Sequence, residues 1–267
     1  MPDFRRNDIR GLPEGNGKRS GSGLGKVHCR VIACDFDGTS ATNGQLAPEL
    51  YAILAEARRQ GILTLLATGR VLEEAQRLGE NAPFDVIIAE NGAIVYLSIP
   101  RCTIQLGSPP PNGFLDELRA TGLPFHAGAV IVGTQEQHAS HLRHLIYRFG
   151  IDAHLVFNRN DVMLLPNGIN KATGIRCALD IMGRSERNMI AFGDAENDIP
   201  MLMTAALGVA ARDSIPSVLA LADDRVPEPG GAGVALYIHR ILNRGGFLPN
   251  LRREKIPLGR TSDGDDH

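Results

Sequence analysis

RVIACDFDGTS, residues 30–40, decides the fold of this chain, because an apolar run in it ends abruptly at two aspartates. Val31 to Cys34 is typical of a buried strand, and Asp35 and Asp37 follow at its end. In open α/β sheets, ligands bind beyond the carboxyl ends of the strands. The segment therefore predicts a rigid strand that presents two carboxylates to a ligand.

Composition and charge restrict the classes of partner. The 267 residues are 43% hydrophobic and 22% charged, which is typical of a soluble globular protein with one large domain or two modest ones. A formal net charge of −2 provides no basic field for a polyanion, so we expect no nucleic-acid partner. No apolar run approaches the roughly 20 residues that cross a bilayer, and MPDFRRNDIRG lacks the apolar stretch of a secretory signal. We expect a cytoplasmic protein without membrane contact, whose four scattered cysteines are reduced.

The order of apolar runs and helical patterns indicates the fold class. Strands are expected at 27–35, 61–68 and 84–90, with helices at 47–60 and 71–79 between them, followed by a hairpin at 92–106. The same alternation resumes after residue 167. Strands separated by helices imply right-handed crossovers and a parallel sheet. The predicted class is α/β, with a doubly wound, mostly parallel, Rossmann-like core.

A breaker, GSPPPNG at residues 107–113, opens a small α+β unit inserted into this core. In it we expect a strand at 125–133, a helix at 135–150, and strands at 152–158 and 161–166 joined by a turn at Arg159-Asn160. The predicted organisation is a flexible leader at 1–26, a core of 27–106 and 167–243, an insertion at 107–166, and an irregular tail at 244–267.

Acidic residues follow two of the predicted strands. Asp35 and Asp37 follow the first, and Asp194 and Asp198 follow the strand near residue 190. Four carboxylates around one point would repel each other unless a cation joined them. Mg²⁺ prefers carboxylates together with water and phosphate oxygens. The cluster therefore predicts a Mg²⁺ site that works on a phosphate.

Groups that bind phosphate oxygens lie at the same predicted edge. They are the Thr68 hydroxyl, the backbone N–H groups near Gly38 and Gly69, and a lysine. At this point the motifs become recognisable. DFDGT, ATGR, the lysine of NKATG and GDAEND, in that order, resemble the four motifs of the haloacid dehalogenase-like phosphohydrolase superfamily. The insertion resembles the type IIB cap of the branch that includes sugar-phosphate, sucrose-phosphate and phosphoglycolate phosphatases.

The resemblance implies a role for each motif. Asp35 would be the nucleophile that forms an aspartyl-phosphate, and Asp37 the general acid and then the base. Thr68 and Lys171 would bind the transferring phosphoryl group. Mg²⁺ would be held by Asp35, the backbone carbonyl of Asp37, and Asp194, with Asp198 and Asn197 as direct or indirect supports. Substrate contacts are expected from Gly38, Thr39, Gly69, Arg70, Asn91 and Asn197.

Two departures and several alternatives accompany this interpretation. Ser40 stands where the family often has leucine, and the cap is short for its branch. The predicted function is a Mg²⁺-dependent phosphomonoester hydrolase acting on a small phosphate ester, either a sugar phosphate or phosphoglycolate. A phosphomutase and a non-catalytic regulatory domain stay open as alternatives. A receiver-type signalling module does not match, because a receiver lacks such an insertion.

His138, His141 and His144 drift around a helix, so a solvated surface is favoured over zinc.

Overall fold

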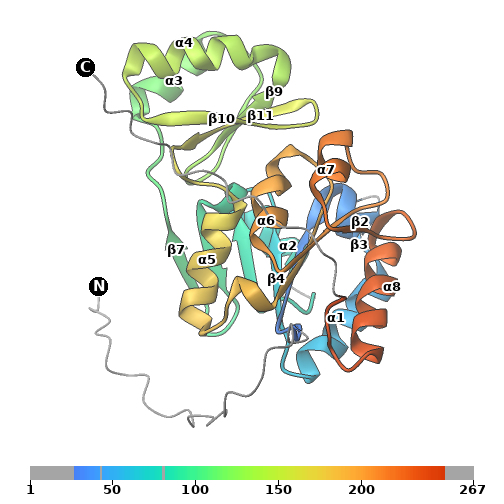
Figure 1. Ribbon diagram of the computed structural model, residues 1–267. Helices are drawn as coiled ribbons and strands as arrows, with labels where there is room; N and C mark the ends of the chain where they lie inside the picture. The colour runs from blue at the N-terminus through green and yellow to red at the C-terminus, as the bar shows by residue number, and fades with distance from the viewer. Residues whose placement is uncertain (1–26, 43, 80–81, 250–267) are drawn as a thin grey trace, which may run out of the picture.

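A computed structural model describes residues 27–42, 44–79 and 82–249 (Figure 1). Its main sheet has the strand order β14-β13-β12-β1-β4-β5-β6-β7. The strands from β14 to β5 are parallel, and β6 and β7 extend the sheet as an antiparallel hairpin. The bounds are β1 Val31–Asp35, β4 Leu63–Ala67, β5 Val86–Ala89, β6 Ile94–Leu97, β7 Cys102–Gln105, β12 Met189–Gly193, β13 Leu207–Ala210 and β14 Asp224–Arg225. The predicted α/β class with a mostly parallel sheet is confirmed.

Helices cover both faces of this sheet and bury its strands. Ile32 and Cys34 of β1 pack toward α1, α2 and α8, whereas Val31 and Ala33 pack toward α5, α6 and α7. Successive strand residues point to opposite faces, so an uninterrupted apolar run is what a strand between two helix layers requires. The bounds are α1 Pro48–Arg59, α2 Leu72–Gly79, α5 Lys171–Met182, α6 Ile199–Thr204, α7 Pro216–Leu221 and α8 Gly230–Asn243. Within the described residues, no helix combines the length and apolarity needed to span a membrane.

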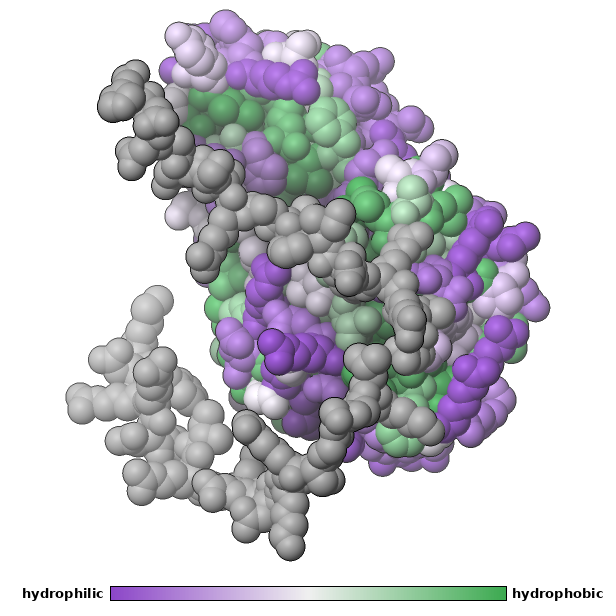
Figure 2. Space-filling view, viewed as in Figure 1, coloured by the Kyte–Doolittle hydropathy of each residue, from purple (hydrophilic) through white to green (hydrophobic). Residues whose placement is uncertain are grey.

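A second sheet belongs to the inserted unit, which we call the cap. Its strand order is β10-β11-β9-β8, all antiparallel, and α3 and α4 cover one face (Figure 1). The bounds are α3 Asn112–Ala120, β8 His126–Ala127, β9 Val132–Gln135, α4 Ala139–Phe149, β10 Ala153–Asn158 and β11 Asp161–Pro166. The outer rim of the cap is hydrophilic, and apolar residues lie below it at the level of the sheet (Figure 2).

The single strand expected at 125–133 was wrong in detail. The chain turns at residues 128–131, where the N–H of Gly128 donates to the carbonyl oxygen of Ile131, and this turn divides the segment into β8 and β9. The apolar run gave no sign of the turn, because Val130 and Ile131 lie within the turn and are buried like strand residues. A short hairpin β2 Ala41–Thr42 and β3 Gln45–Leu46 was not predicted either.

The chain passes from core to cap and back at adjacent points. A Cβ added to Gly107 would lie 2.9 Å from Cγ of Pro166, so the outgoing and returning segments are in contact. The cap lies beyond one edge of the main sheet (Figure 1). The division into a core and a cap at 107–166 stays a prediction at residue level. The expected leader at 1–26, and the tail from residue 250 on, lie outside the described residues.

Candidate active site

The central strand of the sheet positions the candidate nucleophile. Asp35 is the last residue of β1, and β1 pairs in parallel with β4 on one side and β12 on the other. Asp35 lies opposite Ala67, and Thr68 and Asp194 directly follow the ends of the two neighbouring strands. Parallel strands end at the same edge of a sheet, so three segments that are distant in sequence meet there.

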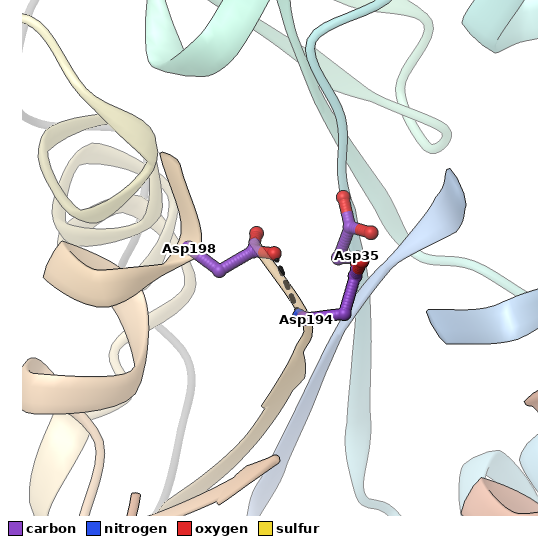
Figure 3. Close-up of side chains that lie close together, drawn as sticks. All are labelled: Asp35, Asp194 and Asp198. Carbon is purple, nitrogen blue, oxygen red and sulfur yellow. Dashed lines mark hydrogen bonds between the residues drawn. The ribbon is translucent and has the colours of Figure 1, made fainter. Parts of the chain in front are cut away.

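Three carboxylates gather at this edge. One carboxylate oxygen each from Asp35, Asp194 and Asp198 lies within 4.8 Å of the others, and all three residues are buried (Figure 3). Asp198 Oδ2 accepts hydrogen bonds from the backbone N–H groups of Asp194 (2.9 Å) and Ala195 (3.1 Å). A Cβ on Gly193 would lie 2.5 Å from the Cβ of Asp198, so only glycine permits this close approach.

A buried lysine joins two of these carboxylates. Lys171 Nζ lies 2.6 Å from Asp35 Oδ1 and 2.6 Å from Asp198 Oδ1. Lys171 is the first residue of α5, and a capping box between Asn170 and Thr173 fixes where that helix begins. The start of the helix therefore sets the position of the ammonium group.

Charge at this cluster is not balanced by the lysine alone. Burial raises the pKa of Asp35 well above its usual value, and the carboxylates of Asp198 and Asp194 add to this, while Lys171 opposes it. Burial and Asp198 also raise the pKa of Asp194. Burial by itself would lower the pKa of Lys171, but the carboxylates of Asp198 and Asp35 raise it, so the ammonium stays protonated. The residues therefore fit a divalent cation, and the buried Asn197 Oδ1, which accepts no hydrogen bond, offers a further oxygen.

The turn after β1 carries the second aspartate. It spans Phe36–Ser40, and Gly38 has φ 80°, in the left-handed region that favours glycine. A Cβ on Gly38 would lie 2.5 Å from Asp194 Oδ2. The Asp37 carboxylate pairs with the Arg70 guanidinium through Nε (2.8 Å) and Nη2 (2.7 Å).

Two hydroxyl groups of the same turn brace the site. Thr39 Oγ1 donates to Asp194 Oδ1 at 3.0 Å. Ser40 Oγ donates to the carbonyl oxygen of Asp35 at 2.5 Å. Ser40, where the family often has leucine, thus contacts the backbone of the candidate nucleophile itself.

A cavity of about 680 Å³ lies between this edge and the cap. Its core side is lined by Asp35, Asp37, Gly38, Gly69, Arg70, Val71, Glu74 and Asn197, and its cap side by His126, Asn158, Arg159, Asn160, Asp161 and Met163. A hollow of about 810 Å³ around Arg58 and Arg184 is larger, but it lies at the other end of β4 and contains none of the clustered carboxylates. Of these two cavities, the smaller one is lined by carboxylates and arginines that can take part in a reaction.

Glu90 and Arg159 make two of the contacts between the cap and the core. The buried carboxylate of Glu90, which follows β5, accepts hydrogen bonds from the backbone N–H groups of Ala129 (2.8 Å), Val130 (2.8 Å) and Ile131 (3.1 Å) in the β8–β9 turn. At the other contact Arg159, at the tip of the β10–β11 hairpin, reaches Asp194 Oδ2 through Nη2 at 2.5 Å.

The chain matches the family model of haloacid dehalogenase-like hydrolases over residues 32–103 and 125–238. The chain belongs to this family. A phosphoglycolate phosphatase of Saccharolobus solfataricus is 36% identical over 221 residues, which cover 80% of this chain and 92% of that protein. A phosphoglycolate phosphatase of Methanosarcina acetivorans is 28% identical over 213 residues, or 74% and 87% of the two chains. A haloacid dehalogenase-like hydrolase of Bacteroides thetaiotaomicron shares the fold at TM-score 0.70 and 20% identity, with 80% and 99% of the chains covered.

The predicted site residues of this hydrolase fall into three groups. Asp35, Asp194, Asp198 and Lys171 form one buried cluster. Asp37, Gly38, Gly69, Arg70 and Asn197 line the cavity. Thr39, Thr68 and Asn91 are buried beside it: Thr68 Oγ1 accepts the N–H of Arg70 at 3.2 Å, and Asn91 Oδ1 accepts from Asn197 Nδ2 at 3.2 Å. Their roles stay predictions.

Sequence reasoning missed two residues of the site. Glu90 is absent from the predicted site residues, and its partners are backbone amides about 40 residues away, which no pattern of side chains indicates. Arg159 was assigned to a turn, which is correct, but its place at the tip gave no hint that the tip reaches Asp194. A charged residue at the tip of a cap hairpin was the only available signal.

Proposed function

We propose that this hydrolase is a Mg²⁺-dependent phosphomonoesterase that works through an aspartyl-phosphate on Asp35. The observation that carries the proposal is the position of Asp35, which ends a rigid central strand, touches a buried ammonium at 2.6 Å and lines the cavity under the cap. A nucleophilic carboxylate divides phosphate-ester hydrolysis into two easier displacements.

Asp35 and Asp194 are the residues that would hold Mg²⁺, together with the backbone carbonyl of Asp37. Asp198 belongs to their support, because Lys171 occupies its Oδ1 and two backbone N–H groups occupy its Oδ2. When bound, Mg²⁺ would balance the carboxylate charge and polarise phosphate oxygens. Two of the three clustered carboxylates, Asp35 and Asp194, would therefore bind Mg²⁺ directly, and the third, Asp198, would not.

The chain's own residues account for the proton and bond changes. Lys171 contacts Asp35 Oδ1, which leaves Oδ2 to attack phosphorus. As the P–O bond to the alcohol breaks, Asp37 is the proposed donor of a proton to the leaving oxygen, a role that requires its carboxyl group to leave the fork that it forms here with Arg70. Water then attacks the aspartyl-phosphate and passes a proton to the Asp37 carboxylate, which Arg70 holds at the cavity wall.

A small phosphate ester is the proposed substrate. The cap covers the cavity, and about 680 Å³ accommodates a metabolite and no polymer. Phosphoglycolate and sugar phosphates are the first candidates, and the names of the relatives from Saccharolobus solfataricus and Methanosarcina acetivorans support phosphoglycolate.

Phosphate release from a panel of small esters, with Mg²⁺ or with EDTA, tests the proposal. We expect turnover that requires the metal and falls at least about 1,000-fold in Asp35→Asn, because the nucleophile is lost. Asp116→Asn, an exposed carboxylate on α3, is the matched control and should behave as the unchanged protein. Turnover in Asp35→Asn within about ten-fold of the unchanged protein would exclude Asp35 as nucleophile.

A further inference from the structure

The tip of the β10–β11 hairpin holds an arginine in an unusual backbone conformation. Arg159 has φ 53°, in the left-handed region that residues other than glycine and asparagine rarely adopt. Its backbone N–H donates to Glu196 Oε2 at 3.1 Å, and the neighbouring Asn160 carbonyl accepts the N–H of Glu136 at 2.7 Å. Strained backbone conformations that the surrounding structure maintains are common at functional sites, which suggests a functional role for the Arg159 side chain.

The two arginines of the cavity differ in how they are paired. Arg70 uses Nε and Nη2 on the two different oxygens of Asp37, the parallel fork that occupies a whole carboxylate. Arg159 directs Nε (3.2 Å) and Nη2 (2.5 Å) to the same oxygen of Asp194, whose other oxygen already accepts from Thr39. The same Nε–Nη2 edge of Arg159 is the edge that binds a free carboxylate in a fork.

Charge at the cluster makes Arg159 available to another anion. The carboxylates of Asp35, Asp194 and Asp198 face one ammonium, from Lys171, so two negative charges stay uncompensated without Arg159. One divalent cation balances both of them. With the cation on Asp194, the charge of Arg159 has no counterpart at the cluster and faces the cavity that it lines.

We infer that Arg159 is the specificity-determining residue of the cap, and that it binds a carboxylate on the leaving group of the substrate. This inference rests on the proposed phosphatase function and narrows its substrate class to phosphate esters of small hydroxy acids. In this arrangement the phosphate group of the substrate lies against the core residues, and its carboxylate extends toward the cap, where the Arg159 guanidinium binds it. Uncharged alcohols of the same size lack this partner.

Two esters that differ at one group test the inference. 2-Phosphoglycolate carries a carboxylate, and 2-hydroxyethyl phosphate carries a hydroxymethyl group in its place. We expect the unchanged protein to prefer the acid. In Arg159→Gln we expect kcat/KM for 2-phosphoglycolate to fall about 10- to 100-fold, the effect of losing a hydrogen bond between two charged groups, mainly through KM. For 2-hydroxyethyl phosphate we expect a change below about three-fold, and Arg159→Lys should recover part of the preference.

Controls separate this role from a structural one. Arg119→Gln removes an exposed arginine of the cap on α3 and should leave the ratio of the two kcat/KM values unchanged. Calorimetric binding of both esters to Asp35→Asn, with and without Arg159→Gln, repeats the comparison without turnover. Equal losses for both esters would mean that Arg159 only seats the cap, and that outcome overturns the inference.

The failure of the inference and the failure of the proposed function give different results. If the unchanged protein releases no phosphate but binds 2-phosphoglycolate through Arg159, the phosphatase proposal fails and the inference stands. If the protein hydrolyses both esters equally well, the phosphatase proposal stands and the inference is wrong. An unchanged preference for the acid in Arg159→Gln also overturns it, as does binding of neither ester.

Discussion

Glu90→Ala is expected to lower the free energy of unfolding by about 3–5 kcal/mol. The Glu90 side chain is buried, and its two oxygens accept three backbone N–H groups of the β8–β9 turn. Val130 and Ile131 are buried, so their N–H groups lose their partner and gain no water, at about 1–3 kcal/mol each. Ala129 is exposed and recovers water. The left-handed φ of 51° stays with alanine, so the substitution relieves no strain.

Gly128 provides a matched test of the same contact. A Cβ on Gly128 would lie 2.5–2.6 Å from the carboxyl atoms of Glu90, and these are its three nearest atoms. Gly128→Ala should therefore cost about 1–3 kcal/mol in the unchanged protein, the usual cost of overpacking. In the Glu90→Ala background the clash is gone, and the cost should fall below about 0.5 kcal/mol.

Urea unfolding of the four proteins followed by circular dichroism measures this coupling, since the chain has no tryptophan for fluorescence. The double-mutant cycle should give an interaction of about 1–2 kcal/mol or more. Additive effects within about 0.5 kcal/mol, or a Glu90→Ala cost below 1 kcal/mol, would refute the reasoning, because the carboxylate would then not be what holds the turn.

Two further substitutions, one of them with a matched control, test the backbone near Asp35 and Lys171. Ser40→Ala removes the donor to the carbonyl oxygen of Asp35 and should cost about 1 kcal/mol by urea unfolding, with a lower kcat for phosphate release; full activity and stability would contradict this role. Gly92→Ala places a Cβ 1.9 Å from the carbonyl oxygen of Asn170 at φ 106°, so we expect the free energy of unfolding to fall by more than about 3 kcal/mol. Gly61 is the matched control: it has φ 77° and no atom within 4 Å of the added Cβ, so Gly61→Ala should cost only about 1 kcal/mol. Similar costs at both sites would show that the positive φ, and not the clash with Asn170, determines the loss.

The sequence was sufficient to predict those features that follow from a local pattern of residue types. Apolar runs between helical patterns predicted the parallel sheet, and aspartates at strand ends predicted that Asp35 and Asp194 would meet. The contacts of Glu90 and Arg159 were not predictable in this way. Both join the core to the cap, and their partners are fixed by how two units pack, which a local pattern does not encode. The β8–β9 turn was hidden because Val130 and Ile131 within it are apolar and buried, as the residues of a strand would be.

Gly107 and Pro166, where the chain leaves and re-enters the core, touch each other. An insertion whose two ends adjoin puts no tension on its host, whatever its length, so the register of the main sheet does not depend on what is inserted. Substrate recognition and chemistry can therefore change separately in evolution: a different insert at this junction would change which molecule is accepted, while the clustered carboxylates and the lysine keep their places.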